Sequence, residues 1–139
     1  MSSTPTVWHL NVPGGLNAPH FARHALSGNL DGELNAERKA DACLLLHELV
    51  TNSVLHAGAD TSQTIGVQLR IDDAVVRIAV TDNGSVSIPS VLKNDAARDG
   101  GGLGLRLVER LSDAWGMQRE GIRGTTMWFE MRRDRRSPA

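Results

Sequence analysis

The chain has 139 residues, of which 40% are hydrophobic and 22% are charged, and its formal net charge is −1. A chain of this length buries about 68% of the surface that it exposes when unfolded, which supports one hydrophobic core but not two. The balanced charge gives no reason to expect nucleic acid as a partner. We therefore expect one soluble domain over residues 1–132, with no nucleic-acid partner.

Cysteine content and hydropathy restrict the cellular compartments in which the protein is expected. Cys43 is the only cysteine, so neither an internal disulfide framework nor a CxxC zinc motif can form. Residues 1–12 contain no basic region and no continuous apolar run, and no stretch of about 18 apolar residues occurs anywhere. These features favour the cytoplasm and argue against export or membrane insertion.

Three elements are predicted in the first part of the chain. Residues 7–12 alternate between apolar and polar, which is typical of a strand. Residues 18–27 carry apolar side chains at helical spacing, and Gly28 should end this helix. Asn35 is a suitable N-cap for a longer helix that lacks proline and glycine and extends to Ala57.

The rest of the chain alternates between short strands and one helix. The predicted elements are strands at 65–71 and 76–80, a loop over 83–99, a helix from 103, and strands at 117–120 and 125–131. The first two of these strands should form a β-hairpin. The Arg-rich tail, residues 133–139, is expected to be disordered.

The long helix carries a polar stripe. Glu48, Asn52 and His56 are spaced four residues apart, so each lies about 40° around the helix from the last. Such a stripe can simply be the solvated face of an amphipathic helix. Because leucine and valine flank it on both sides, the stripe can instead hold a ligand. The carboxylate of Glu48 could then act as a general base, and the amide oxygen of Asn52 could bind Mg²⁺.

Two further segments combine polar groups with glycine. Asp82 and Gly84 follow an apolar strand, where a carboxylate can accept a hydrogen bond from an amine and glycine lets a flat ring approach. A plain turn is the alternative. The second segment opens a predicted helix, where free N–H groups favour phosphate. It consists of Gly100, Gly101, Gly102, Leu103, Gly104 and Leu105, and a flexible hinge is its alternative.

A fourth segment, Gly124-Thr125, opens the last strand and could bring a hydroxyl to the same pocket. In this order, the four segments resemble the N, G1, G2 and G3 boxes of the GHKL, or histidine kinase-like, ATPase superfamily. The small size and the run from His47 to Asn52 are most similar to anti-sigma regulatory factor kinases of the serine/threonine type. The resemblance covers the chain from about Val7 to Met131.

The resemblance implies roles for individual residues. Asn52 would bind Mg²⁺, Glu48 would polarise the attacking hydroxyl or water, and Asp82 would bind the adenine amine. The backbone from Gly100 to Leu105 would hold the phosphates of ATP, while Thr125 would support the base. The implied fold is a two-layer α/β (α+β) sandwich of the Bergerat type, with a mixed, mostly antiparallel sheet and helices on one face.

The implied function is an ATP-binding kinase that phosphorylates an anti-sigma antagonist and sequesters a sigma factor. Val86 stands where the G1 box usually has a second glycine, and only about 20 residues separate Asp82 from Gly102. These departures leave a second hypothesis open, a non-catalytic module that binds its partner with little or no ATP turnover. A homodimer is also expected, because members of this family often dimerise.

Overall fold

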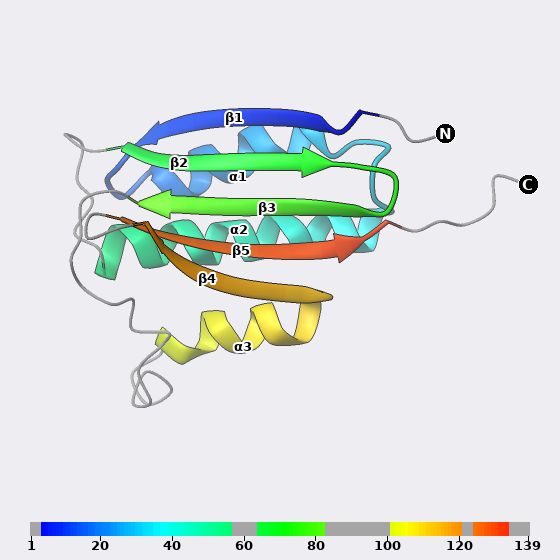
Figure 1. The fold of residues 1–139 in the computed structure, drawn as a ribbon. Helices are drawn as coiled ribbons and strands as arrows, with labels where there is room; N and C mark the ends of the chain where they lie inside the picture. Colours follow the sequence, from blue (N-terminus) through cyan, green and yellow to red (C-terminus); the bar gives the residue numbers. More distant parts are fainter. Residues whose placement is uncertain (1–3, 57–63, 83–100, 121–123, 134–139) are drawn as a thin grey trace, which may run out of the picture.

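The computed structural model describes residues 4–56, 64–82, 101–120 and 124–133. Within these ranges it contains three helices and five strands (Figure 1). In chain order they are β1 (Thr6–Pro13), α1 (Ala18–Asn29), α2 (Ala36–His56), β2 (Thr64–Ile71), β3 (Val75–Asp82), α3 (Gly101–Leu111), β4 (Ala114–Glu120) and β5 (Gly124–Arg132). None of the helices in these ranges is long and apolar enough to cross a membrane.

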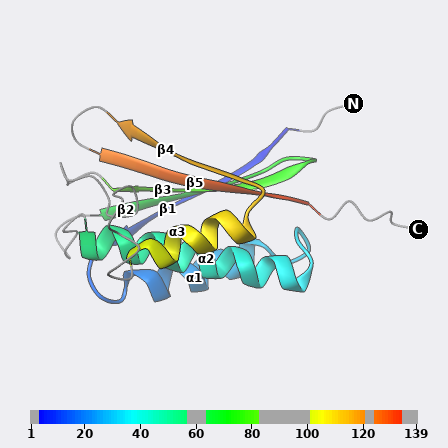
Figure 2. The same ribbon diagram turned by 90° about the horizontal axis from the view of Figure 1, so that it is seen from below.

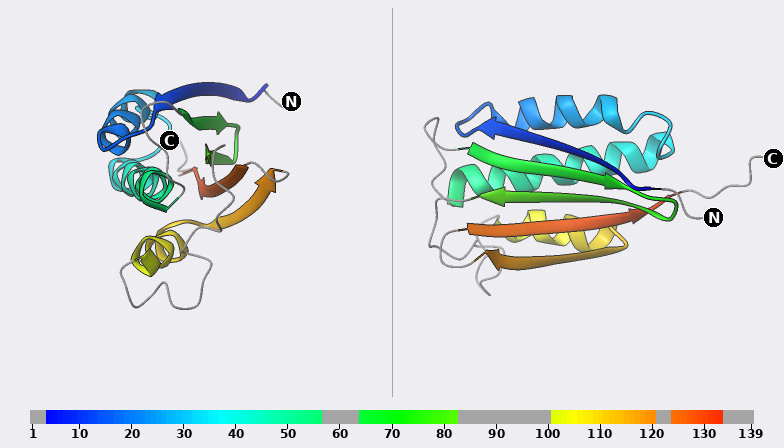
Figure 3. Two further views of the ribbon diagram at one scale, coloured as in Figure 1. Left: turned by 90° about the vertical axis from the view of Figure 1, so that its left-hand side faces the viewer. Right: turned by 45° about the horizontal axis from the view of Figure 1, so that its top comes forward.

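The strands form one sheet in the order β1-β2-β3-β5-β4. All three helices cover the same face of this sheet, so the molecule has two layers (Figures 2 and 3). This confirms the predicted two-layer sandwich. We expected a mixed sheet, but all four pairings in the described part of the chain are antiparallel.

The core lies between the two layers and follows from the sequence pattern. Alternate residues of β2, from Ile65 to Ile71, are buried, and the same alternation on β5 buries Thr125, Met127, Phe129 and Met131. On α2 the buried side chains fall at helical spacing and face the sheet. They are Ala42, Cys43, Leu45, Leu46, Leu49, Val50 and Ser53.

Local hydrogen bonds fix the start of α2 and the β2–β3 turn. The Asn35 Oδ1 atom accepts a 2.8 Å hydrogen bond from the backbone N–H of Arg38, which confirms Asn35 as the N-cap. In the turn, Asp72 Oδ1 accepts hydrogen bonds from the backbone N–H groups of Ala74 and Val75, at 2.7 and 2.8 Å. These bonds lower the pKa of Asp72, because they stabilise its charged form.

An ionic cluster ties the layers together at the end where α2 begins. Asp113, just before β4, forms an ion pair with Arg38 of α2 and accepts a 2.6 Å hydrogen bond from the backbone N–H of Arg132. Arg133 pairs with Glu33 at 2.8 Å and donates a 2.9 Å hydrogen bond to the carbonyl of Asp72. Of the tail expected to be disordered, only Arg133 is described, and it is held by these contacts.

Among the boundaries that differ from the prediction, those of α1 and β4 involve glycine. Helix α1 continues through Gly28 to Asn29, and a positive φ occurs instead at Gly32, where the chain reverses. Strand β4 begins at Ala114 and not at 117, because Gly116 pairs with Trp128 of β5. A Cβ atom at Gly116 would lie 2.7 Å from the Trp128 ring, so the indole occupies the space that a side chain would need.

Trp8 and Trp128 lie on opposite faces of the sheet. Trp8 pairs with the buried Leu69 and packs against the core. Trp128 pairs with Ala79 on the face that no helix covers. There the guanidinium of Arg77 lies 4.1 Å from the centre of the indole ring and forms a 3.2 Å ion pair with Glu130.

Candidate nucleotide-binding site

The candidate site lies at the end of the sheet where β3 ends and β5 begins. Asp82 is the last residue of β3, and it pairs directly with Thr125, the second residue of β5. Paired residues of antiparallel strands point to the same face of a sheet. Asp82 is 5% exposed and Thr125 is 2% exposed, so both side chains point into the space under the helices. The two predicted base-binding residues are therefore neighbours.

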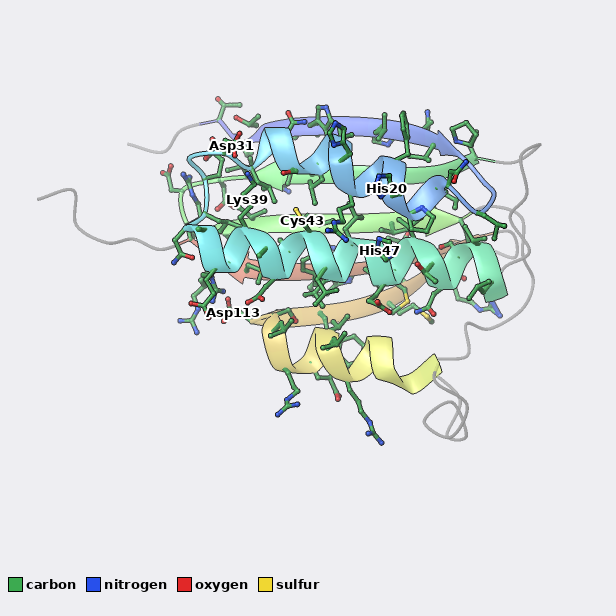
Figure 4. All side chains as sticks on the ribbon, turned by 180° about the vertical axis from the view of Figure 1, so that it is seen from behind. His20, Asp31, Lys39, Cys43, His47 and Asp113 are labelled. Carbon is green, nitrogen blue, oxygen red and sulfur yellow. The ribbon has the colours of Figure 1, made fainter. Side chains whose placement is uncertain are left out.

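Helix α2 contributes the second pair of site residues. Glu48 and Asn52 are both half-buried and lie one turn apart on this helix. From the 100° helical rotation, they lie on one flank of α2, whereas Cys43 and His47 lie on the opposite flank. Cys43 lines a groove shared with α1, so Glu48 and Asn52 are on the side of α2 that faces α3 (Figure 4).

Unpartnered polar atoms coincide with the predicted residues. Within the described part of the chain, four buried side-chain polar atoms have no hydrogen-bond partner. Three of them are Asn52 Nδ2, Asp82 Oδ1 and Thr125 Oγ1. Most buried polar groups in folded proteins are hydrogen-bonded, and leaving one unpaired costs about 1–3 kcal/mol. Such atoms are expected where a ligand supplies the missing partner.

Burial also changes the ionisation of Asp82. Loss of solvent disfavours the carboxylate and raises the pKa of Asp82 to about 6. The group is therefore largely ionised at neutral pH, although it is buried and Oδ1 has no partner in the described residues. A ligand with an N–H donor would stabilise this carboxylate.

The glycine-rich segment forms the start of α3. The helix begins at Gly101, so Gly101, Gly102, Leu103 and Gly104 supply its first four N–H groups, which have no acceptor within the helix. This end of α3 lies at the same end of the molecule as Asp82 and Thr125 (Figure 1). The prediction of a glycine-rich helix N-terminus is thus confirmed. Gly84 and Gly100 lie outside the described residues, as does the side chain of Leu105.

These residues fit an adenine nucleotide. The carboxylate of Asp82 is an acceptor for an exocyclic amine, and the Thr125 hydroxyl beside it can donate or accept. The α3 N-terminus suits phosphate. For Mg²⁺, the amide of Asn52 can present its oxygen by rotation, and Glu48 adds a carboxylate. Among the described residues, no group of three or more His, Cys, Asp or Glu could hold a metal ion.

The fourth unpartnered atom belongs to His47, to which sequence reasoning gave only a structural role. Its Nδ1 atom is buried without a partner, while its backbone carbonyl accepts a 2.7 Å hydrogen bond from the Thr51 hydroxyl. His47 lies one turn from Cys43, on the flank of α2 opposite to Glu48. It is therefore separate from the polar stripe of Glu48 and Asn52.

Comparison with known proteins identifies the class. Residues 17–131 match the family model of the histidine kinase-like ATPase domain. The chain therefore belongs to this family, which implies ATP as its nucleotide. A search of curated proteins found no match.

Among solved structures, the fold is similar to the crystal structure of the RsbU and RsbW domains of Rv1364c from Mycobacterium tuberculosis, with a TM-score of 0.68 and 23% sequence identity. The match covers 91% of this chain and 32% of that chain, so this chain spans about a third of that protein's length. At this identity the likeness establishes the fold alone.

Proposed function

We propose that this protein is an ATP-dependent serine/threonine kinase of the anti-sigma factor type, which phosphorylates an anti-sigma antagonist and sequesters a sigma factor. The observation that carries the ATP-binding part is the adjacent pair of unpartnered buried atoms, Asp82 Oδ1 and Thr125 Oγ1. The similarity in fold to a mycobacterial protein with an RsbW domain supports the anti-sigma assignment. A cytoplasmic location and a homodimer are part of the same proposal.

Each site residue has a defined task in this proposal. Asp82 accepts a hydrogen bond from the adenine amine, and Thr125 supports the base directly or through water. The resemblance assigns the backbone of Gly84 and of Gly100 to Leu105 to binding of the nucleotide and its phosphates. Asn52 holds Mg²⁺, which neutralises phosphate charge when it is bound. Glu48 polarises the hydroxyl of the protein substrate.

The second candidate function is a binding module with little or no ATP turnover. Val86 in the G1 segment and the short interval between Asp82 and Gly102 favour this alternative. In such a module, nucleotide would set the conformation of the partner-binding surface or would be absent. Glu48 would then have no effect on regulation.

The two candidate functions can be distinguished by measuring whether the γ-phosphate of ATP is transferred to a partner protein. Proteins retained by the immobilised chain are incubated with Mg²⁺ and ATP labelled at the γ-phosphate, and a Glu48→Gln variant serves as the matched control. A kinase labels a retained protein on serine or threonine, and Glu48→Gln removes the label while it still binds ATP. Retention of a partner with no label from either protein would support the binding module instead.

A further inference from the structure

A pair of threonines lies directly behind the candidate base-binding pair. Thr81 comes immediately before Asp82 on β3. Thr126 comes immediately after Thr125 on β5, and the strand register pairs it with Thr81. Because successive residues of a strand point to opposite faces of a sheet, both threonines lie on the face that no helix covers (Figure 2). Their hydroxyl oxygens are 2.6 Å apart, so one hydroxyl donates a hydrogen bond to the other.

This hydrogen bond links β3 and β5 at the end of the sheet that holds the candidate site. Arg77 and Glu130 form another cross-strand contact, a 3.2 Å ion pair, but they lie four residues further along each strand. At about 3.4 Å per residue, that ion pair is roughly 14 Å away. On its other side Thr81 pairs with Gly66 of β2, which has no side chain to hold it. The hydrogen bond with Thr126 therefore restrains the last residues of β3.

The candidate base-binding atoms depend on the backbone for their position. Neither Asp82 Oδ1 nor Thr125 Oγ1 has a hydrogen-bond partner among the described residues, so no protein group there holds either atom in place. Their separation is set by how closely the end of β3 lies to the start of β5. A side-chain hydrogen bond one residue away on both strands limits that separation. Recognition of a rigid ligand benefits from such fixed spacing, because ordering mobile groups on binding lowers affinity.

We propose that Thr81 and Thr126 are positioning residues for recognition of the adenine base. Their hydrogen bond holds β3 and β5 together, so that the Asp82 carboxylate and the Thr125 hydroxyl have a fixed spacing before the nucleotide binds. Neither Thr81 nor Thr126 touches the nucleotide, because both side chains point to the opposite face of the sheet. The role rests on the proposed function, which it deepens, because it requires that Asp82 binds the base.

Valine substitutions at the two positions remove the hydrogen bond with little change in shape. Valine and threonine are both β-branched, so the preference for strand geometry is retained. Thr81 and Thr126 are partly buried and line a hollow of about 450 Å³ on the uncovered face, so solvent reaches the hydroxyl that remains. Thr64→Val, on β2 in the lining of the same hollow, is the matched control. Thr64 is exposed and has no side-chain hydrogen bond within the described ranges.

The test is calorimetric titration of each variant with ATP and with inosine triphosphate, both with Mg²⁺. Inosine triphosphate lacks the adenine amine and has the same phosphates, so the ratio of the two affinities reports recognition of the amine. Thr81→Val and Thr126→Val should each lower this ratio about three- to tenfold, the fold-change that corresponds to one ordinary hydrogen bond. Thr126→Ser, which keeps the hydroxyl, and Thr64→Val should leave the ratio within about twofold.

The double variant Thr81→Val/Thr126→Val tests whether the two hydroxyls act through one bond. It should lower the ratio no more than either single variant does, because the hydrogen bond is lost only once. In all the valine variants the affinity for inosine triphosphate should stay within about twofold of that of the natural protein. Thermal unfolding without nucleotide shows which variants are folded, and if one valine variant does not fold, the other supplies the comparison.

Three results would overturn the positioning role alone. The first is an equal loss of affinity for both nucleotides in the valine variants, which would indicate a general structural effect. The second is a preference for ATP that does not change in the valine variants. The third is a loss in the double variant that equals the sum of the two single losses. Absence of any preference for ATP in the natural protein would instead overturn base binding by Asp82, and the positioning role with it, so the two failures are distinguishable.

Discussion

The side chains of Asp82 and Thr125 are polar, although the other buried side chains along the same strands are apolar. Along β5 the other buried positions are occupied by Met127, Phe129 and Met131. Unpartnered polar groups in such surroundings lower stability, which is a common property of binding sites. A substitution that removes this cost should therefore stabilise the fold while it weakens the binding of ligand.

Asp82→Asn should raise the free energy of unfolding at pH 7.5 by roughly 1–3 kcal/mol, because it removes a buried charge. The pKa of Asp82 is raised to about 6, so between its unfolded pKa and pH 6 the folded state retains a proton that the unfolded chain has released. Stability therefore falls as pH rises through this window, and stays lower above it. Urea unfolding at pH 5 and 7.5 should show a larger gain for the variant at pH 7.5. An equal gain at both values would contradict this assignment.

The same ionisation predicts how nucleotide recognition depends on pH. Below about pH 6 Asp82 becomes protonated, and its charge-assisted bond to the adenine amine weakens. Inosine triphosphate lacks this amine but carries the same phosphates, so it corrects for phosphate titration. We expect the ratio of ATP affinity to inosine triphosphate affinity to fall by about tenfold from pH 7.5 to pH 5. A ratio independent of pH would show that Asp82 does not bind the amine.

At the scale of elements, the strand β4 depends on contact between a glycine and an aromatic ring. Sequence reasoning placed the start of this strand at Met117 and left Gly116 outside it. The structure places Gly116 within the strand, since Trp128 of the neighbouring strand covers it and is itself covered by Arg77. This arrangement depends on cross-strand register, which local sequence does not encode.

Gly116→Ala should therefore destabilise the protein by roughly 1–3 kcal/mol, because the new methyl group would lie 2.7–2.9 Å from atoms of the Trp128 ring. Gly28→Ala is the control. No atom lies within 4 Å of a Cβ at that position, and alanine should stabilise α1 by roughly 0.5–1 kcal/mol. Thermal unfolding and Trp fluorescence measure both changes. Equal effects of the two substitutions would argue against the ring contact.

Part of the candidate site could be predicted from the order of short motifs and from the alternation of apolar residues in the sequence. Their roles came from a resemblance, and the placement of Asp82 beside Thr125 agrees with it because strand pairing follows from the alternation of apolar residues. The groove between α1 and α2, which Cys43 lines, was not predicted. It arises from side chains of two helices that are brought together only by packing, so no single segment of the sequence indicates it.

At the scale of the whole molecule, the two ends of the sheet differ in character. The end that holds the β2–β3 turn is fixed by Asp72, Asp113 and Arg133 through ion pairs and backbone hydrogen bonds. The opposite end brings together the unpartnered atoms of Asp82 and Thr125 and the start of α3. The ionic and turn contacts thus lie at one end of the sheet, and the candidate ligand site lies at the other.

Hydrogen exchange should reveal this difference. The first four N–H groups of α3, from Gly101 to Gly104, have no acceptor within the helix and should exchange rapidly in the free protein. Addition of Mg²⁺ and ATP should slow their exchange, because phosphate would accept their hydrogen bonds. The amides of Ala74 and Val75 at the far end should not change. Protection that is uniform along the chain, or absent from α3, would contradict this prediction.

The central claim is that Asn52, Asp82 and the start of α3 bind Mg²⁺ and ATP together. The most direct test is calorimetric titration with ATP, with and without Mg²⁺, of the natural protein, of Asn52→Ala, and of a Gln68→Ala control on the uncovered sheet face. We predict micromolar to sub-millimolar binding that requires Mg²⁺, is lost in Asn52→Ala and is retained in Gln68→Ala. Absence of binding by the natural protein, or equal binding by Asn52→Ala, would contradict the claim.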